Sequence, residues 1–388
     1  MLETMNTHQA GASSANGLDI VEIRSQIIDI PTVRQHKLSS LSTTQQNYVL
    51  VRVRTSNGVE GIGEAATLGG PRWSEESVES IKATVDRYLA PAVLGERADR
   101  FEHVAALMDR AAKRNTAAKS AVESALFDAV GKTLGVPAST LLGGAVRDRM
   151  RVFWTLASGD VGQEIDEAEQ KLAQRKHNAF KVKIGAQEPD ADMRRMERLA
   201  AALDGRATLI VDANQAWDET TAVRCLERLH AVGVTLVEQP LPAWNVAGMA
   251  RLRGRAQVPL MADEAIFSEH DALAVGAAGA ADVVSLKLVK HGGLLGTKRV
   301  AAVAEAAGIG LYGGCLLESS VGAAAHLQVF ATLRNLDWHC EHFGPQILRD
   351  DLVTAPIAYD NFEVLLPSGP GLGVVLDEEK VRHYAREA

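Results

Sequence analysis

The pattern of hydrophobic and polar positions changes character along the chain, and the first change falls near residue 77. Residues 18–31 (LDIVEIRSQIIDIP) and 47–65 (NYVLVRVRTSNGVEGIGEA) alternate or run apolar as β-strands do, with Ser56-Asn57-Gly58 as a turn. From residue 77 to about 135 the apolar residues recur at helical spacing. An antiparallel sheet followed by a group of helices predicts an α+β domain.

After Arg147 short apolar strands alternate with helical stretches. We expect eight strands, at 151–157 (RVFWTLA), 179–185 (AFKVKIG), 208–214 (TLIVDAN), 235–240 (TLVEQP), 259–265 (PLMADEA), 283–289 (VVSLKLV), 310–318 (GLYGGCLLE) and 337–343 (DWHCEHF). Continuous apolar strands are typical of a parallel sheet buried on both faces. Eight β/α units most economically close into a (β/α)₈ barrel, a TIM-type fold, with a doubly wound open sheet as the alternative.

These patterns predict the division of the chain. We expect a flexible tail at residues 1–17, an N-terminal α+β domain at 18–147 and a barrel domain at 148–345. The segment 346–388 returns to strand and turn character, so we expect it to complete the N-terminal domain.

Composition and charge exclude several classes of protein. The 388 residues are 46% hydrophobic and 23% charged, which is typical of a soluble globular protein. A formal charge of −8 argues against a nucleic-acid partner, and no apolar run is long enough to cross a membrane. The three cysteines form no CxxC pair and the N-terminal segment lacks the apolar core of a signal peptide. We therefore expect a cytoplasmic protein.

Charged residues stand where seven consecutive predicted strands end, the place where (β/α)₈ enzymes carry catalytic groups. They are Lys183, Asp212, Glu238, Asp263, Lys287, Glu318 and Glu341, spaced 23 to 31 residues apart. Asp212, Glu238 and Asp263 come from three consecutive strands and would converge on one side of the barrel mouth. Three carboxylates without Cys or His favour Mg²⁺ or Mn²⁺ over Zn²⁺. The alternative is that each carboxylate caps the helix that follows.

Two lysines lie on one side of the strand at 179–185. Lys181 and Lys183 are two residues apart, so they point to the same face, which is the interior in a barrel. A second ammonium nearby and a divalent cation would both disfavour the charged form of Lys183 and lower its pKa, and a lysine that can lose its proton can exchange protons with carbon. Lys287 would face the other side of a bound substrate. A solvated edge strand is the alternative interpretation of the two lysines.

Further polar residues near these strand ends receive smaller roles. Glu264 directly follows Asp263 and is expected to pair with Lys287, while Asn214 and Gln215 would support their neighbours. The histidines 291, 339 and 342 have no metal-binding spacing, and no role is expected for them.

Several motifs together resemble one family. KVK, DANQAW, EQP, ADE and SLKLVKHGG, in this order, resemble the enolase superfamily in its muconate lactonizing enzyme (muconate cycloisomerase) subgroup. The resemblance runs from residue 18 over essentially the whole chain. The capping domain of the subgroup resembles DIPTVRQHKLS and GVEGIGEA, and its signature helix resembles AKSAVESALFDAVGKTLGVPASTLLGG. The C-terminal segments of the subgroup resemble CEHFGP and GPGLGV. The resemblance implies an α+β cap over a modified barrel.

The resemblance also implies roles for individual residues. Mg²⁺ or Mn²⁺ would be bound by Asp212, Glu238 and Asp263, and Lys183 would transfer the proton with Lys181 assisting and Lys287 opposite. Glu341 would act as an acid or orient the substrate. The segment TLGGPRWSEES resembles a substrate-covering loop, so contacts with a small dicarboxylate substrate are expected from Leu68, Trp73, Asn214, Glu318 and Phe343. A symmetric homo-oligomer, often an octamer, is also implied.

The implied activity is the metal-assisted lactonisation of cis,cis-muconate through an enolate. The chloromuconate cycloisomerase branch is similarly close, and succinylbenzoate synthases and N-acylamino acid racemases share the two-lysine arrangement. From the residues alone, a Schiff-base lyase with Lys183 or Lys287 as the nucleophile also remains open, as does a barrel that binds ligands without catalysis.

Overall fold

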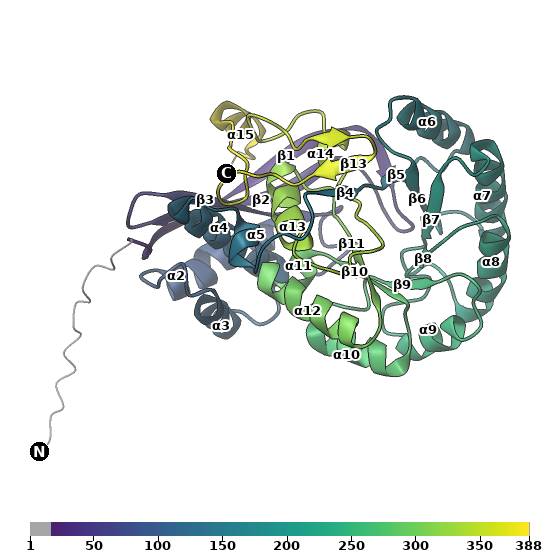
Figure 1. Ribbon diagram of the computed structural model, residues 1–388, viewed down its shortest axis with the longest axis horizontal. Coiled ribbons are helices and arrows are strands. Elements are labelled where there is room, and N and C mark those ends of the chain that lie inside the picture. Colours follow the sequence, from purple (N-terminus) through teal and green to yellow (C-terminus); the bar gives the residue numbers. More distant parts are fainter. Residues whose placement is uncertain (1–16, 388) are drawn as a thin grey trace, which may run out of the picture.

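The computed structural model describes residues 17–387, and it has the predicted fold class: an α+β cap joined to a parallel barrel (Figure 1). All but residue 17 of the predicted flexible tail, 1–17, lies outside the described residues. The domain boundaries at 147 and 345 stay predictions. Within residues 17–387, none of the helices has the length and apolar character needed to cross a bilayer.

The cap begins with a three-stranded antiparallel sheet in the order β1-β2-β3. Its strands are β1 (Ile20–Lys37), β2 (Ser42–Thr55) and β3 (Glu60–Thr67). The helical part that follows consists of α1 (Val78–Thr84), a π-helical turn (Val85–Leu89), α2 (Ala90–Val93), α3 (Phe101–Ala111), α4 (Thr116–Leu134) and α5 (Ala138–Leu141). This order matches the predicted strands followed by helices.

Helix α4 packs on β3 at unusually short range, which two glycines permit. A Cβ atom on Gly63 would lie 2.1 Å from the carbonyl oxygen of Ala121, and one on Gly61 would lie 2.1 Å from that of Ala125. The facing helix positions are alanines, which also keep the two backbones close. The glycines in VEGIGEA therefore serve packing between the sheet and α4.

Seven parallel strands form the barrel wall, in the order β5 to β11 without reversal. They are β5 (Trp154–Leu156), β6 (Ala179–Lys183), β7 (Thr208–Asp212), β8 (Val237–Glu238), β9 (Leu260–Ala262), β10 (Val283–Leu286) and β11 (Gly310–Gly313). An order without reversal excludes the doubly wound sheet, in which the strand order reverses at a switch point.

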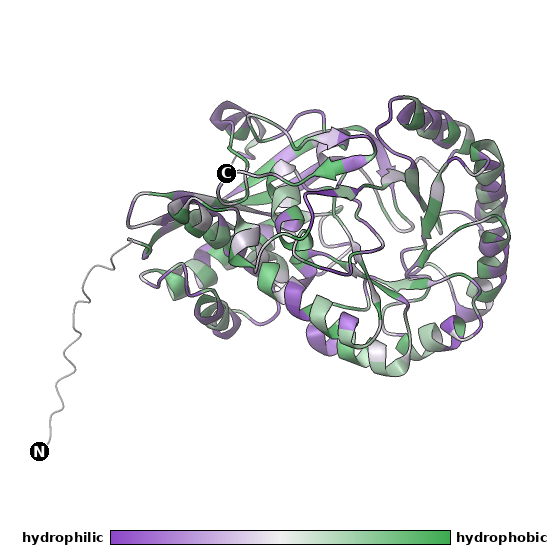
Figure 2. Ribbon diagram, viewed as in Figure 1, coloured by the Kyte–Doolittle hydropathy of each residue, from purple (hydrophilic) through white to green (hydrophobic). Residues whose placement is uncertain are grey.

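The helices that connect the strands lie on the outside of the barrel (Figure 1). They are α6 (Val161–Ala173), α7 (Pro189–Leu203), α8 (Glu219–Ala231), α9 (Val246–Arg253), α10 (Glu269–Ala278), the single turn α11 (Leu288–His291), α12 (Leu294–Ala306) and α13 (Ser320–Phe330). In Figure 2, α7 and α8 carry both hydrophilic and hydrophobic residues, as expected for helices with one face on the barrel and one in solvent.

The eighth predicted strand, at 337–343, is wrong as an extended strand. Only Cys340 pairs, through parallel bridges to Val152 and to Gly313. His339 has a left-handed backbone with φ of 66°, which no β-strand accommodates. Backbone hydrogen bonds of residues 338–341 nevertheless join β11 on one side to Arg151 and Phe153 on the other, so this short segment closes the barrel.

The C-terminal segment returns to the cap and to the base of the barrel. Strands β12 (Tyr359–Asp360) and β13 (Glu363–Leu365) form a second antiparallel sheet with β4 (Arg149–Arg151), while α14 (Gly344–Ile347) lies before them. Helix α15 (Glu378–Tyr384) is followed by Arg386, whose backbone N–H donates to the Ile27 carbonyl at 2.9 Å. The predicted return of the C-terminal segment is confirmed.

A separate hydrophobic layer fills the lower part of the barrel interior. It consists of Phe153, Ala179, Ile210, Leu236, Met261, Val283 and Tyr312. Consecutive units of the wall each supply one of these side chains, as in other filled (β/α)₈ barrels. This layer is apolar, and the polar residues at the carboxyl ends of the strands lie above it.

Gly63→Ala tests the packing of α4 on β3. The added methyl group meets backbone rather than a movable side chain, so we expect the free energy of unfolding to fall by about 2–3 kcal/mol. Thermal unfolding followed by circular dichroism measures the loss. The control is Gly254→Ala, whose Cβ would lie 3.6 Å from its nearest neighbour. Equal stability of the two variants would contradict the close-packing interpretation.

Candidate active site

The carboxyl ends of the barrel strands bring the predicted metal ligands side by side. Lys183, Asp212 and Glu238 are the last residues of β6, β7 and β8, and the parallel register pairs Lys183 with Asp212 and Asp212 with Glu238. Asp263 directly follows β9. The three carboxylates are at most 1% exposed. Their convergence depends only on strand order and strand length.

Helix capping does not explain these carboxylates. The helices α8, α9 and α10 are capped by Asp218, Asn245 and Ser268, each accepting a backbone N–H three residues ahead. The caps are therefore supplied by other residues, which leaves Asp212, Glu238 and Asp263 free for another role.

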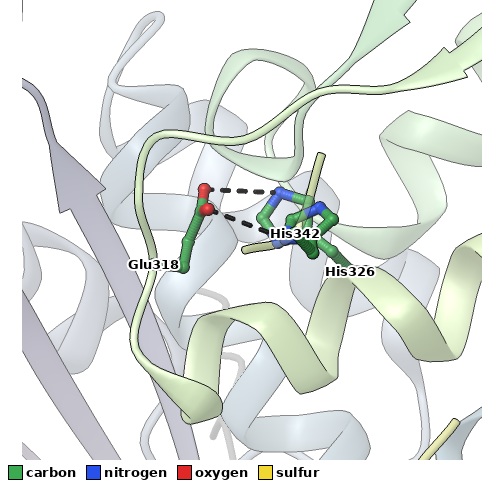
Figure 3. Close-up of side chains that lie close together, drawn as sticks. All are labelled: Glu318, His326 and His342. Atoms are coloured by element: carbon green, nitrogen blue, oxygen red, sulfur yellow. Dashed lines mark ion pairs between the residues drawn. The ribbon is translucent and has the colours of Figure 1, made fainter. Parts of the chain in front are cut away.

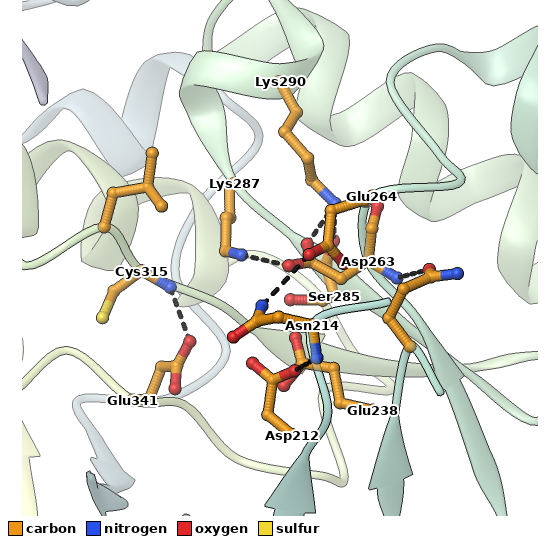
Figure 4. A network of polar contacts seen from close by, with 12 residues as sticks. Asp212, Asn214, Glu238, Asp263, Glu264, Ser285, Lys287, Lys290, Cys315 and Glu341 are labelled. Atoms are coloured by element: carbon orange, nitrogen blue, oxygen red, sulfur yellow. Dashed lines mark hydrogen bonds and ion pairs between the residues drawn. The ribbon is translucent and has the colours of Figure 1, made fainter. Parts of the chain in front are cut away.

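Lysines and carboxylates are ion-paired around the mouth, and Figure 4 shows Lys287 and Lys290 beside Asp263. The ammonium of Lys183 lies 2.5 Å from Asp212 Oδ2, and that of Lys287 lies 2.5 Å from Asp263 Oδ2. Lys181 lies 2.6 Å from Glu238 Oε2. Lys183, at the end of β6, and Lys287, directly after β10, thus hold different carboxylates.

Lys181 is the most enclosed of the predicted lysines. It is 1% exposed, and besides Glu238 its ammonium contacts Glu341 Oε2 at 2.5 Å. Burial acts to lower the pKa of Lys181, but the charges of Glu238 and Glu341 outweigh it and hold that pKa well above the usual range. The two acids keep it as an ammonium.

The carboxylate set fits a hard cation. Glu238 Oε1 is buried and has no hydrogen-bond partner, and burial together with the nearby charge of Asp212 raises the pKa of Glu238 well above its usual range. Asp263 differs: burial acts to raise its pKa, but Lys287 and Lys290 hold it below the usual range. Carboxylate oxygens concentrated without Cys or His are the ligands that Mg²⁺ and Mn²⁺ prefer.

A second group of possible ligands lies nearby. Within residues 17–387, one group of three possible metal-binding side chains has its ligand atoms all within 4.8 Å of one another. It consists of Glu318, His326 and His342 (Figure 3). Asp212, Glu238 and Asp263 are not gathered into so compact a set, since lysines lie among them. Neither His326 nor a role for His342 was predicted from the sequence.

His326 is already fully hydrogen-bonded, which weakens this group as a metal site. Its Nδ1 bonds the Gly322 carbonyl at 2.8 Å, and its Nε2 accepts the backbone N–H of Leu288 at 3.0 Å. Burial lowers the pKa of His326 to about 4, so the ring is neutral, and burial raises the pKa of Glu318 to about 7. The rings of His326 and His342 are neutral, since burial lowers both of their pKa values, and the cluster is a buried neighbour of the mouth.

Asn214 connects Lys183 to Glu264. Its backbone N–H donates to Asp212 Oδ1 at 2.8 Å, its Oδ1 accepts from Lys183 at 3.1 Å, and its Nδ2 donates to Glu264 Oε1 at 3.0 Å. The expected pairing of Glu264 with Lys287 is wrong, because Lys287 pairs with Asp263. Asn214 therefore supports both the first predicted metal ligand and the lysine expected to transfer the proton.

The covering loop brings Trp73 to the site. The Lys287 ammonium lies 4.4 Å from the centre of the Trp73 ring, a distance typical of a cation–π contact. Leu68 is buried, and Phe343 is buried with its ring 4.9 Å from that of Trp154. Substrate contacts by Leu68, Trp73, Asn214, Glu318 and Phe343 stay predictions.

Two cavities open where the cap meets the barrel. One of about 780 Å³ is lined by Glu264 and Phe267 from the barrel and by Lys119 from the cap, and one of about 250 Å³ is lined by Lys183 and by Lys37. Both cavities reach residues of the polar network, and side chains from the cap and from the barrel line them together.

The cap also holds the loop after β11 by its main chain. Tyr48 donates to the Leu317 carbonyl at 2.7 Å, Gln46 donates to the Leu316 carbonyl at 2.7 Å, and Glu64 accepts from the backbone N–H of Ser319 at 3.0 Å. Leu317 has a left-handed backbone with φ of 60°. The cap thus fixes a strained loop that carries Glu318.

Sequence reasoning missed two buried residues that contact Asp263. They are Gln239, in the EQP motif, and Lys290, in SLKLVKHGG. Lys290 stands three residues after Lys287, a spacing that places both lysines on one side of a helical turn. That spacing, inside an otherwise apolar segment, was the available signal.

Comparisons with known proteins agree with this architecture. The family model described as Enolase C-terminal domain-like matches residues 163–380, and the one for the mandelate racemase / muconate lactonizing enzyme N-terminal domain matches residues 23–143. Both domains of the resemblance are therefore matched.

Similar proteins cover nearly the whole chain. Muconate cycloisomerase 1 from Pseudomonas putida is 47% identical, over 92% of this chain and 96% of that protein. A chloromuconate cycloisomerase from Cupriavidus necator is 44% identical, over 96% and 100%. The crystal structure of muconate lactonizing enzyme from Pseudomonas fluorescens complexed with muconolactone has a TM-score of 0.94 and 44% identity, covering 95% of this chain and 100% of that one.

The buried contact of Glu64 with Ser319 predicts a pH dependence of stability. Burial raises the pKa of Glu64 to about 8 from an ordinary 4.5, with the charges of Glu318 and Asp351 adding to the shift. The protonated form is favoured in the folded protein, so its stabilisation is complete below about pH 4.5 and is lost as the pH rises through about 8.

Glu64→Gln removes this titration while keeping the shape of the side chain. Between pH 5 and 8 we expect the free energy of unfolding of the wild type to fall relative to that of the variant, by at most about 1.4 kcal/mol for each pH unit. The melting temperature of the wild type should fall with it. The control is Glu60→Gln, at an exposed position of the same strand, which should show no such trend. Parallel melting curves for wild type and Glu64→Gln would contradict the assignment.

Proposed function

The chain belongs to the enolase superfamily, in its mandelate racemase / muconate lactonizing enzyme family, and from this membership we propose that it catalyses the lactonisation of cis,cis-muconate to muconolactone. The observation that supports the proposal best is the pair of lysines on opposite sides of one carboxylate set, Lys183 at Asp212 and Lys287 at Asp263. Such an arrangement would offer a proton donor on either side of a substrate bound between the two lysines.

The charges of the site suit a small dicarboxylate. Lys183 and Lys287 each contact a single carboxylate, whereas Lys181 is enclosed by Glu238 and Glu341. A divalent cation bound by Asp212, Glu238 and Asp263 would add positive charge and act as a Lewis acid toward one substrate carboxylate. Together these groups provide the attraction that an acidic protein needs for a dianion.

The reaction needs one ring closure and one proton. A carboxylate oxygen of muconate adds to the double bond conjugated with the other carboxylate, and a C–O bond forms. The π electrons move toward that second carboxylate as an enolate. Lys183 then donates a proton to the α-carbon, giving the lactone and a neutral lysine, which regains its proton from solvent. Asn214 holds Lys183 at 3.1 Å and so limits where its proton is delivered.

Glu341 completes the arrangement as a positioning group. It accepts the backbone N–H of Cys315 at 3.0 Å and binds Lys181 at 2.5 Å. These contacts orient Lys181 beside Glu238. We therefore propose that Lys181 assists by charge and geometry while Lys183 transfers the proton.

A second candidate substrate is chloromuconate. A chloromuconate cycloisomerase matches this chain over 96% of its length at 44% identity, close to the 47% of the muconate cycloisomerase. The ratio of kcat/KM for muconate and for 2- and 3-chloromuconate distinguishes the two. A Schiff-base lyase is disfavoured because the lysines are ion-paired, and borohydride trapping with substrate would detect it.

Metal identity, assembly and location complete the proposal. We propose Mn²⁺ or Mg²⁺ as the cofactor, a homo-oligomer that is often an octamer in this subgroup, and the cytoplasm as the compartment. The cysteines 225, 315 and 340 are buried and unpaired, which suits a reducing compartment. Light scattering measures the assembly.

Lys183→Ala tests the proton-transfer role. We expect lactone formation to fall by at least about 10²–10⁴-fold, because the enolate loses its proton donor. The loss of muconate absorbance follows turnover, and calorimetry checks that Mn²⁺ still binds. Lys176→Ala, at an exposed position before the same strand, should retain full activity. A Lys183→Ala variant as active as wild type would refute the assignment.

Removal of divalent ions tests the carboxylate site. Dialysis against a chelator should abolish muconate turnover, and added Mn²⁺ or Mg²⁺ should restore it, since the three carboxylates need a cation to stabilise the enolate charge. In D₂O, NMR of the product should show one deuterium at the protonated carbon. Full activity after complete metal removal would exclude this mechanism.

A further inference from the structure

Every polar atom of Asp263 has a hydrogen-bond partner (Figure 4). Gln239 and Lys290 are structural partners, whereas Lys287 is expected to take part in the reaction. The backbone N–H of Asp263 donates to Gln239 Oε1 at 3.0 Å, its carbonyl accepts from Lys290 at 2.8 Å, and its Oδ1 also accepts from Lys290 at 2.7 Å. Only Oδ2 contacts a group expected to take part in the reaction, Lys287 at 2.5 Å.

Lys290 is a fixed partner. It is fully buried, and its third hydrogen bond goes to the Ser285 carbonyl at 2.7 Å, so all three N–H donors of the ammonium are used. Its backbone lies in the single turn α11, directly after Lys287. Movement of Lys290 away from Asp263 would leave a buried ammonium and a buried oxygen unpaired, which costs several kcal/mol.

Gln239 fixes the backbone of Asp263 from the neighbouring strand. Its Oε1 accepts the N–H groups of Asp263 and Ala265, and its Nε2 donates to the Leu241 carbonyl at 2.9 Å. The reverse amide orientation would set donors against donors, so this one is determined. Gln239 thus fixes the backbone of Asp263, and the carboxylate can turn only by breaking the bond from Lys290 to Oδ1.

Asp212 is held in the same way. Its Oδ1 accepts the backbone N–H of Asn214 at 2.8 Å, and its Oδ2 contacts Lys183 at 2.5 Å. Each aspartate of the set thus has one oxygen occupied by an immobile donor and one oxygen shared with a lysine at the mouth.

We propose that Lys290 is a positioning residue that blocks Oδ1 of Asp263, restricts this carboxylate to one oxygen toward a bound cation, and so selects Mg²⁺ or Mn²⁺ over Ca²⁺. Ca²⁺ takes six to eight oxygens and often binds both oxygens of one carboxylate, whereas Mg²⁺ requires near-octahedral single contacts. The inference rests on the proposed function only in taking the three carboxylates as the cation site.

The test compares two cations on one protein. Dissociation constants for Mn²⁺ and for Ca²⁺ are measured by calorimetry without substrate, for wild type and Lys290→Met. The change of charge affects both dications alike, so their affinity ratio isolates the blocked oxygen. We expect wild type to prefer Mn²⁺, and the preference to fall about tenfold or more in Lys290→Met.

The control is Lys298→Met in α12. Lys298 also gives its ammonium to a backbone carbonyl, that of Leu142 at 2.5 Å, and it is not among the residues that contact Asp263. Lys298→Met should keep the wild-type ratio of Mn²⁺ to Ca²⁺ affinity even if its melting temperature falls. A purely structural role for Lys290 would lower the melting temperature of Lys290→Met and leave that ratio unchanged.

Each outcome decides a separate question. An unchanged ratio in folded Lys290→Met overturns the inference while leaving the proposed function intact. If that variant does not fold, wild type decides: equal affinity for Ca²⁺ and Mn²⁺ overturns the inference, and a clear preference for Mn²⁺ supports it. Wild type that binds neither cation refutes the proposed function itself, and the inference with it.

Discussion

The neutralisation of buried carboxylates is the interaction on which the barrel mouth depends. Asp212, Glu238, Asp263 and Glu341 are all but inaccessible to solvent, and each lies within 2.7 Å of a lysine ammonium. An unpaired buried carboxylate costs several kcal/mol, so the strand ends could not hold this set without the lysines. The groups proposed to perform the chemistry are thus also those that make the folded mouth stable.

The lysines divide into two classes by the number of their partners. Lys181 is enclosed by two carboxylates, and Lys290 has all three donors bound, so both are fixed. Lys183 and Lys287 each hold one carboxylate oxygen, with an amide oxygen or an aromatic face as the second neighbour. The less constrained pair is the pair suited to contact a substrate, since less has to be broken.

The sequence allowed the main features to be predicted because they follow from local periodicity. The two-residue period placed Lys181 and Lys183 on one face, and the position of each strand end placed the carboxylates at one mouth. The features that failed depend on tertiary neighbours or backbone conformation. His339 breaks the eighth strand with a left-handed φ, and Lys287 pairs with Asp263 while Glu264 accepts a hydrogen bond from Asn214. The burial of Lys290 and His326 is likewise set by packing, which no spacing reveals.

The cap fixes the loop after β11 through backbone groups rather than side chains. Gln46 and Tyr48 bond the carbonyls of Leu316 and Leu317, and Glu64 bonds the N–H of Ser319. A contact to a main-chain atom survives a change of side chain at the same position. These bonds fix the backbone on both sides of Glu318, while the side chains of Cys315, Leu316 and Leu317 are buried in the hydrophobic core. None of these three bonds involves the ion-paired lysines and carboxylates of the mouth, so the position of Glu318 and the pairing of the mouth rest on separate contacts.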